Sequence, residues 1–179
     1  MDITNVNWQS MRNVIIFILL VLFQVLVCNN ILLFGVAIPL PFIYFIISLP
    51  LLLNPNILFL VAFLLGFSVD LFSDTLGLNS IGCLLLAIAK KPMFYAYMPR
   101  EDKNIDFSPS LASMGWENYI KYIISLSLIY CLIVFFIEFT SFAAFGRILI
   151  MSVTSAIFTT LLMIGIDALA SSQTRNHDR

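Results

Sequence analysis

Long runs of apolar residues, separated by short polar or proline-containing segments, account for most of this chain. Of its 179 residues, 61% are hydrophobic and only 11% are charged. A soluble domain carries about 25% charged residues, so this chain has too little charge to cover a surface that faces water. Apolar runs approaching 20 residues are typical of helices that cross a bilayer. The sequence therefore predicts an all-α, polytopic membrane bundle that forms one domain over residues 1–179.

Six apolar runs predict six transmembrane helices. Their predicted ranges are Asn13–Cys28, about Phe42–Leu53, Ile57–Phe72, about Ser80–Tyr95, Asn118–Phe139 and Arg147–Ala170. The second, third and fourth fall short of the roughly 20 residues that a bilayer core of about 30 Å requires. The segment Ile31–Pro41 is apolar but irregular, and such a re-entrant or interfacial piece is tolerated only where protein satisfies its backbone. A polar loop at about residues 96–117 and a polar tail at 171–179 complete the expected domain.

The distribution of positive charges predicts the orientation of these helices. With six crossings and a cytoplasmic N-terminus, only Arg147 would lie outside. The cytoplasmic side would hold the other eight: Arg12, Lys90, Lys91, Arg100, Lys103, Lys121, Arg175 and Arg179. An excess of Lys and Arg on the cytoplasmic side is what membrane insertion favours. We therefore expect both termini in the cytoplasm.

Few residues are suited to metal or redox chemistry. Cys28, Cys83 and Cys131 lie in apolar surroundings without a C-x-x-C pair, which favours buried hydrophobes over ligands or disulfides. The single histidine, His177, lies in the polar tail. We expect no metal and no cofactor. Motifs of phosphate-binding loops, dinucleotide sites, nucleophile elbows and zinc proteases are absent from the sequence, so an enzyme is not expected.

The segment 66–82 places a carboxylate, Asp70, at the end of an apolar run. A charge at membrane depth costs about 2.5–3.5 kcal/mol on insertion scales, so Asp70 requires an explanation. Ala62, Gly66, Asp70 and Asp74 recur every four residues and share one helix face. The carboxylate could form a cation or proton site, contact a ligand or anchor a partner. Alternatively, it could bond Asn79 or Ser80, or cap the next helix. The predicted topology places it near the outer edge, which favours a tie between the third and fourth helices.

Other polar residues leave alternatives open. Glu138 and Arg147 flank the predicted outer turn, where they could pair with each other or simply face water. Asp167 is expected to reach the lipid headgroups. Ser152, Ser155, Ala156 and Thr159 share a small, hydroxyl-rich face that is expected to pack within the bundle rather than line a substrate path. The loop at 96–117 could be a solvated connector or a docking segment for a cytoplasmic partner.

The hairpin segment resembles the signature of the bacterial rod shape-determining protein MreD family. Members carry a Gly, an Asp-Leu pair at a helix end, and a Leu-Gly-(Leu/Val)-Asn turn into the next helix, with a Pro leading the second helix. The matching positions here are Gly66, Asp70, Leu71, Leu76, Gly77, Leu78, Asn79 and Gly82, with Pro39 or Pro41 before the second helix. The motif spans under a tenth of the chain, whereas size and predicted topology extend the resemblance over most of it.

The resemblance implies a non-catalytic scaffold in the bacterial inner membrane. Such a protein supports cell shape and peptidoglycan synthesis in the elongation complex (the elongasome). The implied partners are an MreC-like single-pass protein, cell-wall synthases and an MreB-type cytoskeletal protein. The implied fold resembles the substrate-binding subunits of energy-coupling-factor transporters, so an alternative is a substrate-binding subunit of a vitamin-type transporter. On this view, hairpin packing and partner contact would involve Gly66, Asp70, Leu71, Asp74, Gly77, Asn79 and Gly82.

Overall fold

The computed structural model describes residues 3–30, 37–75, 77–98, 108–138 and 145–177, and these ranges are almost entirely helical. The long helices are α1 (Ile3–Leu26), α3 (Pro55–Ser73), α4 (Leu78–Tyr97), α6 (Trp116–Glu138) and α7 (Phe145–His177). The short elements are the 3₁₀ turns η1 (Cys28–Asn30) and η2 (Pro41–Ile43), and the helices α2 (Tyr44–Ser48) and α5 (Leu111–Met114). The prediction of an all-α protein is confirmed.

Within the described ranges, three helices are long and apolar enough to cross a bilayer. They are α3, α6 and the Phe145–Ala168 part of α7, and α1 adds a shorter apolar stretch at Asn13–Leu26. Between 28% and 44% of the spanning windows is buried inside the protein, so most of their surface faces outward and is apolar. A water-facing helix would place polar residues there. These helices indicate a membrane protein.

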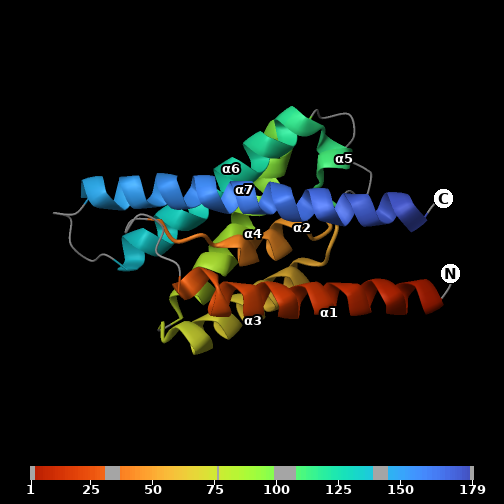
Figure 1. Cartoon of the computed structure of the whole chain (residues 1–179), viewed down its shortest axis with the longest axis horizontal. Coiled ribbons are helices and arrows are strands. Elements are labelled where there is room, and N and C mark those ends of the chain that lie inside the picture. Colours follow the sequence, from red (N-terminus) through yellow and green to blue (C-terminus); the bar gives the residue numbers. More distant parts are fainter. Residues whose placement is uncertain (1–2, 31–36, 76, 99–107, 139–144, 178–179) are drawn as a thin grey trace.

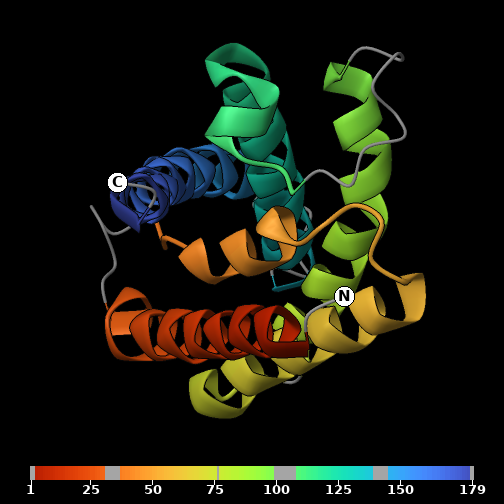
Figure 2. The ribbon, with the colours of Figure 1, turned by 90° about the vertical axis from the view of Figure 1, so that its right-hand side faces the viewer.

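Successive helices run in alternating directions along the molecule. The first residues of α1 and the last residues of α7 consequently project from the same end (Figure 1). Viewed along the molecule, α2 lies in the middle and the long helices surround it (Figure 2). A short helix from the range of the second predicted helix thus lies at the centre of the bundle.

The second predicted helix differs most from the structure. In place of about Phe42–Leu53, η2 and α2 together span only residues 41–48. Pro41 begins this element, and Leu49 leaves the helical region with ψ 150° because Pro50 follows it. The remainder, 49–54, reaches α3 through a turn in which Asn54 accepts a hydrogen bond from the backbone N–H of Asn56. Prolines at both ends therefore limit α2 to little more than one turn.

Residues 37–40, which precede η2, are non-helical, and side chains of α7 accept hydrogen bonds from their backbone. The N–H of Ile38 donates to Ser155 Oγ at 3.0 Å, and the N–H of Leu40 donates to Thr159 Oγ1 at 2.9 Å. Ser152, Ser155, Ala156 and Thr159 are all buried, as expected of a packing face. The expectation that protein must satisfy this irregular piece is met at Ile38 and Leu40, while residues 31–36 lie outside the described ranges.

The remaining boundaries shift at the ends of the chain and in the long loop. α1 begins ten residues earlier than predicted, and α7 continues to His177, so residues 171–177 of the expected polar tail are helical. In the loop at 96–117, Met114 of α5 is buried, which makes this part a docked element rather than a solvated connector. Residues 99–107, including Arg100 and Lys103, lie outside the described ranges.

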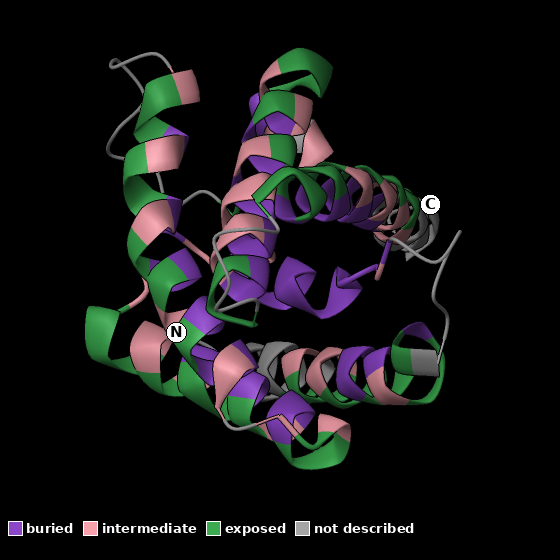
Figure 3. Cartoon of the chain, turned by 90° about the vertical axis from the view of Figure 1, so that its left-hand side faces the viewer, coloured by how far each residue is buried: buried purple, intermediate pink, exposed green. Residues whose placement is uncertain are grey.

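Buried residues are concentrated on α2 and on the inward faces of α3, α4 and α6 (Figure 3). The side chains of Phe42, Ile43, Ile46 and Ile47 are 0% exposed. Cys28, Cys83 and Cys131 are free and buried, which confirms that they are small core residues. The core is thus built around an element that is too short to be an independent helix.

Candidate functional site: the α3–α4 hairpin

The turn between α3 and α4 closes a tight helical hairpin. Asp74 is the C-cap of α3, with φ 54°, and its N–H donates to the carbonyl of Asp70. Gly77 precedes α4 with φ 76°, a left-handed conformation that glycine adopts without steric cost. Nothing lies within 4 Å of a Cβ built on Gly77, so its role is conformational rather than one of close packing.

The carboxylate of Asp70 joins the two helices through five hydrogen bonds. Oδ1 accepts from the hydroxyl of Thr75 at 2.6 Å and from the backbone N–H and side-chain amide of Asn79 at 2.9 and 3.0 Å. Oδ2 accepts from the backbone N–H and the hydroxyl of Ser80 at 2.9 and 2.6 Å. The two backbone donors belong to the first turn of α4, where N–H groups lack partners within the helix and favour a negative charge.

Asn79 extends this network to α6. Its side-chain oxygen accepts a hydrogen bond from the hydroxyl of Tyr130 at 2.8 Å. Asp70, Asn79 and Tyr130 are 4%, 7% and 0% exposed, so the network is shielded from its surroundings. A satisfied buried polar network fixes the relative positions of its members. It therefore holds α3, α4 and α6 in one arrangement.

Two glycines let the helices approach closely around this network. A Cβ added at Gly66 would lie 2.5 Å from Ser80 Cα, which is backbone. A Cβ added at Gly82 would lie 2.8 Å from Cε2 of Tyr130. The small-residue surface near Gly66 and Gly82, which the scaffold hypothesis assigned to a partner, is therefore filled by this chain's own α4 and α6.

The other motif residues face outward or lie beyond the described part. Leu71 is 65% exposed, so of the two roles expected for the motif residues, packing within the hairpin and contact with a partner, it does not take part in the buried packing. It follows Asp70 directly in α3 and is therefore turned about 100° around the helix axis from the buried carboxylate. Asp74 is exposed, as expected of a residue at the edge, and Leu76 lies outside the described ranges. The hairpin thus has an inner polar face and an outer apolar face that includes Leu71 and Phe72.

A second buried charge, Lys90, lies in α4. Its side chain is 1% exposed, and its ammonium donates to the carbonyl of Ile46 at 2.9 Å and to that of Leu49. These carbonyls stand at the C-terminal end of α2, where helix carbonyls lack partners and favour a positive charge. Lys90 was counted among the positive charges of the cytoplasmic side; its side chain is buried in the bundle, whereas Lys91 beside it is exposed.

Asp167 on α7 is also buried, contrary to the expectation that it reaches the headgroups. Its carboxylate accepts from the hydroxyl of Tyr44 in α2 at 2.8 Å and from the N–H of Leu111 in α5 at 3.1 Å. These bonds attach α2 and α5 to α7. The bonds of Tyr44 and Lys90 together explain how α2, which has only five residues, is held in the bundle.

The charged residues at the predicted outer turn and the potential metal ligands add little to this site. Glu138 and Arg147 are exposed, and among the described residues no salt bridge joins them to each other. In that same part of the chain, Arg147 forms no salt bridge with Asp70 or Asp74. Within the described ranges, no three His, Cys, Asp or Glu residues gather as metal ligands.

Sequence reasoning identified Asp70, with Asn79 and Ser80 as possible partners, but missed Thr75 and the burial of Lys90 and Asp167. A signal for Lys90 existed, because Cys83, Ala87, Lys90 and Phe94 follow helical spacing and all are buried. Lys90 thus stands on an otherwise apolar stripe. No comparable pattern marked Asp167, whose partners come from α2 and α5.

Comparison of the chain with models of protein families, with curated proteins and with solved structures finds no match in any of the three.

Proposed function

We propose that this protein is a non-catalytic membrane scaffold, similar to the MreD family, that binds an MreC-like single-pass partner in the bacterial cell-elongation complex. The observation that carries the proposal is the closed set of hydrogen bonds around Asp70. This set occupies the motif that resembles the family and gives its carboxylate a structural task. The proposal includes six crossings of the inner membrane with both termini in the cytoplasm.

The geometry of the network favours a scaffold over chemistry at Asp70. Both carboxylate oxygens already accept bonds, and Asn79 is engaged by Asp70 and Tyr130. A general base needs an oxygen within reach of a substrate proton, and a ligand site needs groups that the protein leaves open. The same argument weighs against the transporter alternative, which required Asp70 and Asn79 to face an enclosed pocket.

The path of the chain supports the proposed topology. The start of α1 and the end of α7 lie at one end of the molecule, as an even number of crossings requires (Figure 1). The segment 37–54 returns toward that end between α1 and α3, with α2 as its only α-helical part. Because Ser155, Thr159 and Lys90 satisfy backbone groups along this segment, it can cross at membrane depth without being one long helix.

The outer apolar face of the hairpin is the surface we assign to the partner. Leu71 and Phe72 are 65% and 66% exposed, and they lie beside the motif at the end of α3. Asp70 and its donors hold this end of α3 against α4, which presents both side chains on a rigid element. A single apolar helix could pack there without any change in the polar network.

The test is co-purification from the native host in mild detergent, with identification by mass spectrometry. We expect a single-pass protein with a periplasmic domain, accompanied by cell-wall synthases. The double variant Leu71→Ala/Phe72→Ala is expected to reduce its recovery about tenfold, which corresponds to about 1.4 kcal/mol of binding free energy. The matched control is Leu60→Ala, because Leu60 is 59% exposed on the same helix but away from the turn between α3 and α4.

Two outcomes would contradict the proposal. If no cell-wall protein is recovered with the parent chain, the proposed scaffold function is wrong. Native mass spectrometry that shows a stoichiometric vitamin-like small molecule would instead support the transporter subunit. A rod-shape complementation assay adds an independent readout, in which the double variant is expected to fail and Leu60→Ala to succeed.

A further inference from the structure

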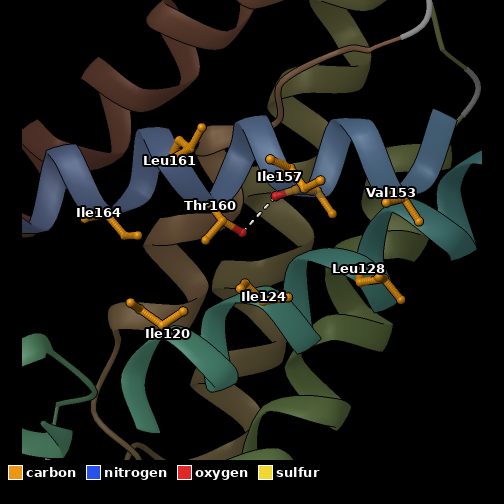
Figure 4. Close-up of a pocket in the computed structure, with 9 residues that line it drawn as sticks. Ile120, Ile124, Leu128, Val153, Ile157, Thr160, Leu161 and Ile164 are labelled. Atoms are coloured by element: carbon orange, nitrogen blue, oxygen red, sulfur yellow. Dashed lines mark hydrogen bonds between the residues drawn. The ribbon is translucent and has the colours of Figure 1, made fainter. Parts of the chain in front are cut away.

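A groove with a volume of about 330 Å³ lies between α6 and α7, away from the hairpin. Ile120, Ile124 and Leu128 of α6 line one side, and residues of α7 line the other (Figure 4). The α7 residues are Val153, Ala156, Ile157, Thr160, Leu161 and Ile164. The groove serves neither the Asp70 network nor the attachment of α2.

The groove is apolar throughout. Thr160 carries the hydroxyl among its lining residues, and this group donates to the carbonyl of Ala156 at 2.8 Å, which leaves no polar group free for an occupant. The rims consist of branched side chains, of which Ile157 and Leu161 are 54% and 60% exposed. An occupant must therefore be apolar along the whole length of the groove.

A charged pair stands at one end of the groove. Glu117 and Lys121 form a salt bridge of 2.6 Å, and both are exposed. With Ile124 and Leu128 they follow the i, i+4, i+7, i+11 spacing of one helix face, so the pair lies on the face that forms the groove wall. On the α7 side, a Cβ added at Gly165 would meet nothing within 4 Å, so this end is also open.

These features favour a lipid over a second helix. Helices associate in lipid through small residues that permit close approach, whereas the rims here are Ile, Leu and Val. A flexible hydrocarbon chain can follow a narrow groove between branched rims. A lysine and a glutamate at one end complement a headgroup that carries both a negative and a positive charge.

We propose that this groove holds an acyl chain of phosphatidylethanolamine, with the zwitterionic headgroup at Glu117 and Lys121. The Lys121 ammonium donates to the lipid phosphate, and the Glu117 carboxylate accepts from the lipid amine. Phosphatidylcholine has no N–H to donate to Glu117, and phosphatidylglycerol has no cation. The lipid site requires a membrane location but is independent of the scaffold function.

The test is native mass spectrometry of the full chain after exchange into an equimolar mixture of these three lipids. We expect the ethanolamine lipid to be retained about threefold over the others, a modest preference because solvent screens exposed charge pairs. Lys121→Gln and Glu117→Gln are each expected to abolish this preference. Lys91→Gln removes an exposed lysine that does not border the groove and is expected to keep it.

A second pair of variants tests the groove itself. Ala156→Leu fills the floor and is expected to reduce retention of all three lipids about tenfold, because the chain loses apolar contact. If Ala156→Leu does not fold, Leu161→Trp at the rim replaces it. Ile150→Trp is the control, since Ile150 is 59% exposed on α7 and does not line the groove.

Three results would overturn the lipid proposal. The first is equal retention of the three lipids by the parent chain. The second is a preference for phosphatidylglycerol that only Lys121→Gln removes, which would assign the site to anionic lipids. The third is a groove variant that keeps its lipid but loses a protein partner, which would assign the groove to a transmembrane helix. Failure of the hairpin experiment would leave the first two readouts, which measure lipid alone, unaffected.

Discussion

Asp70 and Lys90 are two buried charges in the same helical bundle, and they are satisfied in opposite ways. Asp70 lies at the N-terminal end of α4 and accepts from two of its backbone N–H groups. Lys90 lies at the C-terminal end of α2 and donates to two of its carbonyls. Each charge therefore meets the end of the helix dipole that stabilises it. Within the described part of the chain, the hydrogen-bond partners of both charges are neutral side chains and backbone groups.

The two sites differ in where their partners come from. Those of Asp70 are five to ten residues away along the chain, so one hairpin contains the whole carboxylate site. The carbonyls that Lys90 binds are 41 and 44 residues away. Asp70 stabilises a local turn, whereas Lys90 binds the end of α2, a separate element in the core. The first can form early with its hairpin, and the second needs the assembled bundle.

The largest expected effect comes from Asp70→Ala. Removal of the carboxylate leaves the first turn of α4 with buried unsatisfied donors, so we expect a loss of about 3–5 kcal/mol of stability. Unfolding in mixed micelles, followed by circular dichroism, measures this loss. The control is Asp74→Ala, because Asp74 is exposed and close in sequence. An Asp70→Ala protein as stable as the parent but unable to bind its partner would show that Asp70 acts directly in recognition.

Lys90→Met tests the other half of the comparison. It keeps the length of the side chain but leaves the carbonyls of Ile46 and Leu49 without their donor. Each such group costs about 1–3 kcal/mol, offset in part because a buried charge is removed. Hydrogen exchange is expected to rise in residues 41–53 and to stay unchanged in the hairpin. The control is Lys91→Met. An equal rise in exchange in residues 41–53 and in the hairpin of Lys90→Met would mean that the Lys90 and Asp70 sites are not independent.

Two glycine substitutions separate close packing from helix propensity. Gly66→Ala places a methyl group against the backbone of Ser80 and is expected to destabilise the protein by about 1–3 kcal/mol. Gly165→Ala meets open space within a helix and is expected to stabilise it by up to about 1 kcal/mol. Thermal unfolding of both variants measures the difference. If they shift in the same direction, the close approach of α3 and α4 does not matter to stability.

The smallest effect is expected from Tyr130→Phe. This change removes the bond from Tyr130 to Asn79 and retains the ring, so a loss of about 1 kcal/mol is expected. A double-mutant cycle with Asn79→Ala checks whether the two losses share one interaction. Fully additive effects would show that α6 is not coupled to the hairpin through this bond.

The sequence alone determined the helical membrane class, the positions of four long helices after residue 55, and the hairpin network around Asp70. Each depends on local information, namely apolar runs, turn residues and partners within about ten positions. The likeness of residues 66–82 to a family motif is local in the same sense, and the function drawn from it stays a proposal.

Only the tertiary structure decided the short central helix, the burial of Lys90 and Asp167, and the outward position of Leu71. Prolines at 41 and 50 marked the limits of α2, but the bonds that hold α2 and the residues before it come from Lys90, Ser155, Thr159 and Asp167, which are distant in sequence. Charge usually indicates a surface residue, whereas the charge of Lys90 lies at the C-terminal end of a buried helix. The reason is physical, because a helix of five residues cannot satisfy its own terminal backbone groups and must take partners from elsewhere in the fold.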